Sequence, residues 1–210
     1  MISNSAKARF ITIEGVEGVG KTTNIQFITS LLEKAEIPYI VTREPGGTPV
    51  AELIRQLLLT KRDEQICELT ELLLIFAARA QHIHQVIAPA LQAGKWVVCD
   101  RFTDATYAYQ GGGRGLSVDT IATLESMVQG ELRPDLTYIL DLAPEIGLHR
   151  ARQRGELDRF EQEKIEFFNR VRAAYLERAS KDSERCVVID ASMTLENVQA
   201  DIRRHLETIL

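Results

Sequence analysis

The sequence predicts an α/β protein with three layers, in which a five-stranded parallel sheet carries helices on both faces. Short β-branched segments alternate with longer segments whose apolar residues recur at helical spacing. The strand-like segments are apolar throughout, which is typical of strands that are buried on both faces. The 210 residues suit one domain, and neither a linker nor a repeat divides them. We therefore expect a single domain over residues 1–210.

The predicted elements follow in order along the chain. Strands are expected at residues 10–13, 39–42, 96–99, 136–140 and 186–189. Helices are expected at residues 21–35, 48–59, 68–93, 118–128, 144–152, 161–179 and 195–206. Pro89 is expected to kink or break the long helix, because proline removes a helical hydrogen bond.

The composition limits the classes of protein that the chain can represent. Hydrophobic residues make up 45% and charged residues 26%, as in globular proteins. The net charge of −5 argues against general nucleic-acid binding. The three cysteines form no metal-ligand spacing, and neither a signal peptide nor a membrane-spanning run is evident. We expect a cytoplasmic protein without nucleic-acid or membrane partners.

The first apolar strand leads into a glycine-rich loop that fits the pattern G-x-x-x-x-G-K-[ST]. The loop consists of Gly15, Val16, Glu17, Gly18, Val19, Gly20, Lys21 and Thr22. Such a loop presents backbone N–H groups and a helix N-terminus to phosphates. Lys21 should reach the β- and γ-phosphates, and the Thr22 hydroxyl should hold Mg²⁺. The pattern predicts a P-loop NTPase-like fold but leaves a motor ATPase or a small-molecule kinase open; a GTPase would need Asn-Lys-x-Asp, which is absent.

Asp100 and Arg101 follow the third apolar strand directly. Ligands of doubly wound sheets bind beyond the carboxyl ends of the strands. Asp100 could support Mg²⁺, and Arg101 could bind a phosphate with two N–H groups. A surface ion pair is the alternative, but the phosphate loop favours a functional pair.

Residues 150–160 carry a dense set of cations, including Arg150, Arg152 and Arg154. Charge runs usually form a solvated helix face. Here the arginines stand just before Gly155 and an acidic turn, which suits a short lid better. An arginine that reaches the transferred phosphoryl group can accelerate transfer about 10³–10⁵-fold.

The chain resembles bacterial thymidylate kinases along nearly its whole length. The similar segments are residues 13–23, Thr42-Arg43-Glu44-Pro45-Gly46-Gly47-Thr48, Ala77-Ala78-Arg79, Asp100-Arg101-Phe102, Tyr109 to Gly115, Arg154 to Arg159 and Ile189-Asp190-Ala191. The run Arg-Glu-Pro-Gly-Gly-Thr alone is highly specific for this family.

The resemblance implies roles for particular residues. Lys21, Arg101, Arg154 and Glu17 would be catalytic, with Glu17 near the 3′-hydroxyl of the acceptor sugar. ATP would be bound by residues 15–22 together with Thr23, Arg150, Asp190 and Ala191. Thr22 and Asp100 would serve the metal.

The resemblance also implies an acceptor site for dTMP. Its residues would be Glu17, Glu44, Pro45, Arg55, Ile75, Phe76, Arg79, Arg101, Ala105, Thr106, Tyr109 and Gln110. Arg55 and Arg101 would hold the acceptor phosphate, and a cis peptide bond is expected at Pro45. Two departures matter: Ile75 stands where the family has a stacking phenylalanine, so that Ile75 or its neighbour Phe76 covers the base, and Ala105 replaces a common serine.

Arg79 is the only arginine in the long helical segment at 68–93. It either forms a salt bridge at the helix surface, for example with Glu71, or donates hydrogen bonds to the O4 edge of thymine. The resemblance implies an ATP- and Mg²⁺-dependent dTMP kinase that forms homodimers. A kinase for another pyrimidine nucleotide and a nucleotide-gated switch remain as alternatives.

Overall fold

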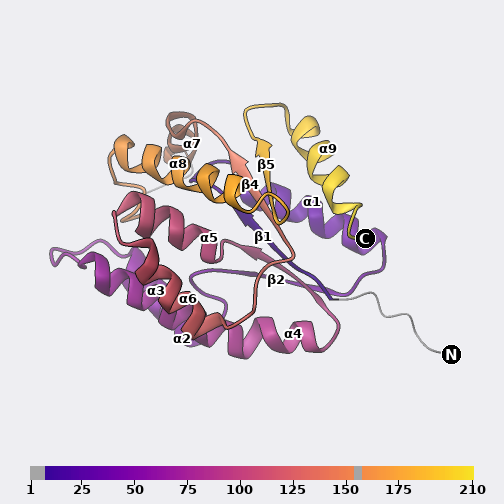
Figure 1. Cartoon of the computed structure of the whole chain (residues 1–210). Coiled ribbons are helices and arrows are strands. Elements are labelled where there is room, and N and C mark those ends of the chain that lie inside the picture. Colours follow the sequence, from indigo (N-terminus) through magenta and orange to yellow (C-terminus); the bar gives the residue numbers. More distant parts are fainter. Residues whose placement is uncertain (1–7, 154–157) are drawn as a thin grey trace.

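The computed structural model describes residues 8–153 and 158–210. Its five strands are all parallel and follow the order β2-β3-β1-β4-β5 across the sheet (Figure 1). They comprise β1 (Phe10–Glu14), β2 (Tyr39–Arg43), β3 (Trp96–Asp100), β4 (Leu136–Asp141) and β5 (Cys186–Asp190). The predicted α/β class and parallel sheet are thereby confirmed.

The helices of the described residues lie close to the predicted segments. They are α1 (Lys21–Lys34), α2 (Pro49–Leu59), α3 (Glu68–His82), α4 (Ala88–Gln92), α5 (Thr103–Thr106), α6 (Val118–Gln129), α7 (Pro144–Arg152), α8 (Ile165–Lys181) and α9 (Leu195–Leu206). The segment at 68–93 is one helical run in which a π-helical turn, η1 (Ile83–Ile87), lies between α3 and α4. The wide turn ends just before Pro89, which has no N–H to donate.

One helical segment was not predicted. Residues 103–113 form α5 and a second π-helical segment, η2 (Tyr107–Gly113). Three consecutive glycines read as a loop in the sequence, but here they allow close packing against α8. A Cβ on Gly112 would lie 2.6 Å from the Cβ of Ala174. The glycines therefore let η2 approach α8 rather than ending the helix.

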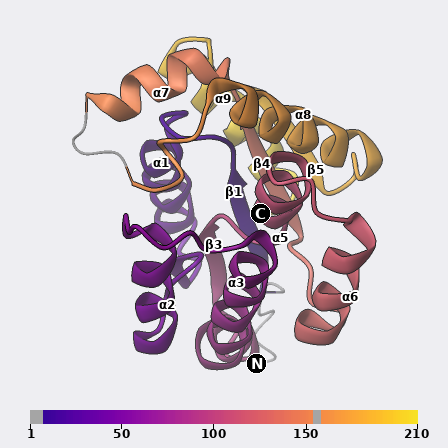
Figure 2. The same ribbon diagram turned by 90° about the vertical axis from the view of Figure 1, so that its left-hand side faces the viewer.

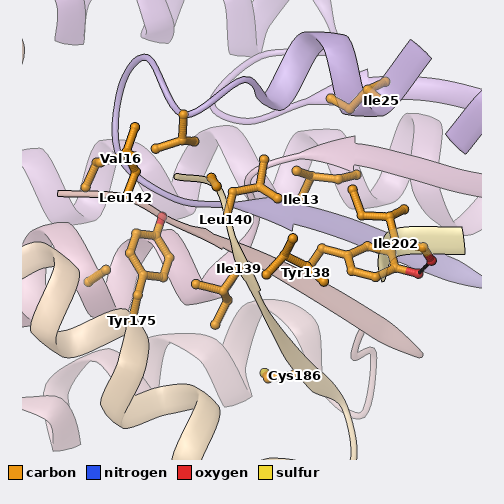
Figure 3. Close-up of a cluster of buried hydrophobic side chains, with 14 of the residues drawn as sticks. Ile13, Val16, Ile25, Tyr138, Ile139, Leu140, Leu142, Tyr175, Cys186 and Ile202 are labelled. Atoms are coloured by element: carbon orange, nitrogen blue, oxygen red, sulfur yellow. Dashed lines mark hydrogen bonds between the residues drawn. The ribbon is translucent and has the colours of Figure 1, made fainter. Parts of the chain in front are cut away.

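The helices cover both faces of the sheet (Figures 1 and 2). α1 and α9 lie on one face, whereas α4, α5 and α8 lie on the other. Figure 3 shows Ile25 of α1 and Tyr175 of α8 on opposite sides of β4, and both belong to the same buried cluster. The Tyr138 hydroxyl donates to the carbonyl of Ile202 across 2.9 Å, which ties α9 to the sheet.

Each strand extends one residue beyond its predicted end, and each added residue is polar. These residues are Glu14, Arg43, Asp100, Asp141 and Asp190. Because the strands are parallel, all five lie at the same edge of the sheet. This is the edge at which doubly wound folds bind ligands.

Candidate active site

The loop between β1 and α1 has the backbone of a phosphate cradle. Gly15, Gly18 and Gly20 have φ angles of 131°, 72° and 93°, which favour glycine. A Cβ on Gly18 would collide with the Gly147 carbonyl of α7. The Val16 and Val19 side chains are buried in the core, so these two residues contribute only their backbone to the inner surface of the loop.

Lys21 is the first residue of α1 and folds back over this loop. Its Nζ donates to the carbonyl oxygens of Gly15 at 3.2 Å and Val16 at 3.1 Å. Burial and then the nearby Arg101 charge lower the pKa of Lys21 to about 8. The ammonium is thus held at the loop, where phosphates would complete its hydrogen bonds.

Arg101 connects the loop to the opposite side of the site. It has a positive φ of 66°, which is uncommon for a residue other than glycine. Its Nη2 donates to the Gly15 carbonyl at 3.3 Å, to Glu17 Oε1 at 2.8 Å and to the Tyr109 hydroxyl at 3.0 Å. Burial lowers the pKa of Arg101, but Tyr109 and Glu17 together with other neighbours outweigh it and raise the pKa well above its usual value.

The candidate metal residues lie at the same edge of the sheet. Thr22 is exposed in the first turn of α1, and Asp100 ends β3. Asp100 Oδ1 is buried and has no hydrogen-bond partner among the described residues. Mg²⁺ usually takes only one or two carboxylate or hydroxyl ligands, with water and substrate phosphates supplying the rest. An orphaned carboxylate oxygen beside a phosphate cradle fits such an ion, although the described residues hold no cluster of three or more His, Cys, Asp or Glu.

A cavity that is partly open to solvent lies next to the loop, and its space together with its open mouth amounts to about 610 Å³. Every residue predicted for the acceptor site lines it except Phe76. The wall consists of Glu17, Glu44, Pro45, Arg55, Leu58, Leu59, Ile75, Arg79, Arg101, Phe102, Ala105, Thr106, Tyr109, Gln110, Asp158 and Phe160. The Glu44–Pro45 peptide bond is cis, as expected.

Ile75 and Phe76 have different environments. Ile75 lines the cavity. Phe76 is buried in a separate cluster with Leu72, and its ring lies 4.9 Å from the guanidinium carbon of Arg79. The sequence left open whether Ile75 or Phe76 covers the base, and Phe76 does not line the cavity because helical spacing turns it toward the core behind Arg79. The aliphatic Ile75 is the residue that faces the cavity from this turn.

Arg79 is almost completely buried, so a salt bridge at the helix surface is excluded. Its Nε donates to Glu44 Oε2 at 2.7 Å, and its Nη2 donates to the Phe102 carbonyl and the Thr106 hydroxyl. Its Nη1 has no partner among the described residues. Nη1 is thus the guanidinium nitrogen of Arg79 that still lacks an acceptor, and Arg79 lines the cavity.

Glu71, the suggested partner of Arg79, instead forms a network of its own. Its carboxylate is 1% exposed and accepts from Gln110 at 2.8 Å, Arg159 at 2.6 Å and Arg114 at 3.2 Å. Arg159 stands between Asp158 and Phe160, which both line the cavity. The network therefore joins the end of the predicted lid to α3.

Some predicted residues lie outside the cavity. Arg150 is exposed near the end of α7, and Asp190 and Ala191 lie where β5 ends, with Asp190 accepting from the Ser192 backbone. Thr23 is exposed on α1. Arg154 lies outside the described residues. None of these positions contradicts the ATP site implied by the resemblance, which stays a prediction.

Five further residues line the cavity that the sequence did not predict there: Leu58, Leu59, Phe102, Asp158 and Phe160. Phe102 follows Asp100 and Arg101 directly, and Asp158 and Phe160 fall in the segment predicted as a lid. Their places next to predicted site residues were the only signal available. Leu58 and Leu59 end α2, where the apolar spacing indicated ordinary core packing.

Comparison with known proteins agrees with this geometry. The family model described as thymidylate kinase matches residues 13–202. The chain belongs to the thymidylate kinase family. It is 58% identical to the thymidylate kinase of Teredinibacter turnerae, over 96% of this chain and 98% of that protein. It is 60% identical to that of Ectopseudomonas mendocina, over 96% of each chain.

A solved structure gives the same result for the fold. The crystal structure of the thymidylate kinase from Ehrlichia chaffeensis superposes with a TM-score of 0.76 at 33% identity. The match covers 95% of this chain and 98% of that one. The predicted P-loop NTPase-like fold and the family resemblance are confirmed. As a member of the thymidylate kinase family, the chain is an ATP-dependent nucleoside monophosphate kinase.

Proposed function

We propose that the chain transfers the γ-phosphoryl group of ATP to the 5′-phosphate of dTMP, giving dTDP and ADP for dTTP synthesis. The observation that carries this proposal is the position of Arg101. It lines the acceptor cavity and also donates to the Gly15 carbonyl in the phosphate loop. One guanidinium thus lies where a donor phosphate and an acceptor phosphate would meet.

The residues of the site suit transfer by positioning and charge stabilisation, without a covalent intermediate. Lys21 and the loop N–H groups would hold the β- and γ-phosphates of ATP. Arg55 and Arg101 would hold the acceptor phosphate, and Glu17 would face the sugar. Thr22 and Asp100 would bind Mg²⁺, which neutralises phosphate charge when bound.

The base would be selected by Arg79. Its unpartnered Nη1 can donate to a carbonyl oxygen such as O4 of thymine, whereas cytosine presents an amino group there. Two facing donors leave both groups unsatisfied, at a cost of about 1–3 kcal/mol for each buried group. Ile75 would cover the base with an aliphatic surface.

A coupled ADP-release assay with a panel of nucleoside monophosphates tests this function. We expect dTMP to give the highest kcat/KM, with dCMP well below it. Equal turnover of several pyrimidine monophosphates would favour the broader kinase. Membership in a kinase family argues against the alternative of a nucleotide-gated switch, which would also need no acceptor-phosphate residue such as Arg101.

We further propose that the chain acts as a homodimer in the cytoplasm, where ATP is available. α2, α3 and α6 lie side by side (Figure 2) and carry exposed apolar residues: Leu53, Leu57, Leu69, Leu73 and Val118. A second copy would cover this apolar surface. Light scattering should give twice the monomer mass, and Leu73→Glu should shift the mass toward the monomer. The described residues contain no helix long and apolar enough to span a membrane.

A further inference from the structure

His82, the last residue of α3, is a buried imidazole behind the acceptor cavity. Its Nδ1 lies 2.9 Å from Glu44 Oε1, and its Nε2 lies 2.6 Å from Thr42 Oγ1. The side chain is completely buried and does not line the cavity. It therefore acts on a ligand only through the residues that it holds.

The hydrogen-bond chemistry of this cluster fixes the direction of the contact between His82 and Glu44. A carboxylate only accepts, so His82 Nδ1 donates to Glu44. The Thr42 hydroxyl can then donate to Nε2, which completes both ring nitrogens. The other oxygen of the Glu44 carboxylate accepts from Arg79 Nε at 2.7 Å. His82 and Arg79 thus share one carboxylate, with one oxygen each.

The shared Glu44 carboxylate fixes the orientation of the Arg79 guanidinium. Arg79 Nη2 is occupied by the Phe102 carbonyl and the Thr106 hydroxyl, while Nη1 remains without a partner among the described residues. Without His82, Glu44 Oε1 would be a buried acceptor with no donor, which is unfavourable. Its nearest cation is Arg79, and a carboxylate that pairs side-on with both Nε and Nη2 would draw Nη2 away from Thr106. The guanidinium would rotate, and Nη1 would leave its position.

The cluster leaves little freedom for another ring position. A Cβ on Gly47 would lie 2.6 Å from His82 Cδ2 and Nε2, and Gly47 has a φ of 84°. The imidazole is therefore packed against bare backbone of the segment that carries Glu44. Contact with this backbone on one side and a hydrogen bond at each ring nitrogen fix the position of the ring.

We propose that His82 is a positioning residue for base selection, which orients Arg79 through the Glu44 carboxylate. The inference rests on the proposed dTMP kinase function. It assigns the choice between dTMP and dCMP partly to a residue that touches neither nucleotide. It also predicts that the nitrogen facing Glu44, rather than the size of the side chain, carries the effect.

Two amide substitutions separate the two nitrogens of the ring. His82→Asn places an amide near Nδ1 and can still donate to Glu44. His82→Gln places it near Nε2 and can reach only Thr42. His82→Leu removes both interactions, and His84→Leu, at an exposed position two residues away, is the matched control.

The readout is the ratio of kcat/KM for dTMP to that for dCMP, measured with the KM for ATP and the melting temperature. We expect His82→Leu and His82→Gln to lower the ratio about 10-fold with the KM for ATP unchanged, while His82→Asn and His84→Leu stay within about 3-fold of the wild type. Equal ratios in His82→Asn and His82→Gln would overturn the inference even if His82→Leu fails to fold. An unchanged ratio with a lowered melting temperature in folded His82→Leu would also overturn it. Wild-type protein that does not phosphorylate dTMP would instead refute the proposed function.

Discussion

Arg101 and Glu17 form an ion pair across 2.8 Å, and Tyr109 donates to the same Glu17 carboxylate at 2.7 Å. Arg101 directly follows β3, whereas Glu17 belongs to the phosphate loop. The pair stands where the acceptor cavity meets the loop. An incoming phosphate would therefore meet an arginine that is already fixed in place, which lowers the ordering cost of binding.

We expect Arg101→Ala to weaken dTMP binding far more than ATP binding. The substitution would remove the proposed charge-assisted hydrogen bond to the acceptor phosphate, and such a bond is typically worth about 1.5–3 kcal/mol, or roughly 10- to 150-fold in affinity. Isothermal titration calorimetry with each nucleotide measures the two losses. Arg204→Ala, at an exposed ion pair on α9, is the control and should leave both affinities unchanged. An equal loss for dTMP and ATP would contradict the assigned role.

Lys21→Ala should abolish phosphoryl transfer while the protein stays folded. The ammonium makes its hydrogen bonds to carbonyls of the loop and not to the core. Circular dichroism should show an unchanged helix content, and the coupled assay should show turnover near background. Wild-type turnover in this variant would show that the loop does not bind the phosphoryl donor.

The lowered pKa of Lys21 predicts a pH dependence as well. The pKa lies at about 8 because burial disfavours the charged form. The charged form is the one that attracts phosphates, so kcat/KM for ATP should fall as the pH rises through about 8. This parameter reports the free enzyme. Lys21→Arg keeps its charge at high pH and should remove this fall, whatever its absolute rate. An identical alkaline limb in both proteins would assign the titration to another group.

Sequence periodicity was sufficient for the sheet and for most helices. The strands at 10–13 and 96–99 could be recognised because apolar residues fill them, but their true ends are Glu14 and Asp100. A polar residue at a strand end pairs through its backbone, and side-chain patterning does not detect this. The helix at 103–113 was missed for a related reason, since Gly111–Gly113 indicate a turn unless the packing against α8 is known.

Local motifs predicted most of the residues that line the cavity, but they did not reveal how those residues contact one another. Glu44 and Arg79 are 35 positions apart in the chain and share a buried ion pair, and Glu44 and His82 are 38 apart. These contacts arise where the segment after β2 meets the end of α3, so spacing in the sequence cannot predict them. Likewise, the surroundings of Phe76 depend on how α3 is rotated, which the apolar run at 72–78 leaves undetermined.

Arg79→Ala should remove much of the preference for dTMP over dCMP. In the proposed site, the buried guanidinium would donate to a carbonyl oxygen at the base edge but not to an amino group, and alanine has no side-chain donor. The kcat/KM for dTMP should fall while that for dCMP changes little. The ratio of the two values is the measure of discrimination. Retention of the full ratio would show that another residue, such as Gln110, reads the base.

Glu71→Gln should destabilise the protein and raise the KM for dTMP without changing the KM for ATP. The buried Glu71 carboxylate pairs with two cations, Arg114 and Arg159. A neutral amide leaves Arg159 without this carboxylate, whereas Arg114 keeps its ion pair with Glu163. Removing one partner of a buried ion pair typically costs about 3–5 kcal/mol. Arg159 also donates to the Leu58 carbonyl at 2.7 Å, and its guanidinium carbon lies 4.4 Å from the Phe160 ring.

The KM for dTMP should rise because Arg159 contacts both Phe160 and Leu58, which line the acceptor cavity. A less restrained Arg159 would hold both residues less firmly in the wall. Glu163→Gln is the matched control. Glu163 also pairs with Arg114, but its side chain is 29% exposed, and no ion pair joins it to Arg159 among the described residues. Urea unfolding gives the loss of stability, and initial rates with each substrate varied in turn give the two KM values. A stability loss with an unchanged KM for dTMP would make Glu71 purely structural. Equal effects of the two glutamate substitutions would place the coupling at Arg114 rather than at Arg159.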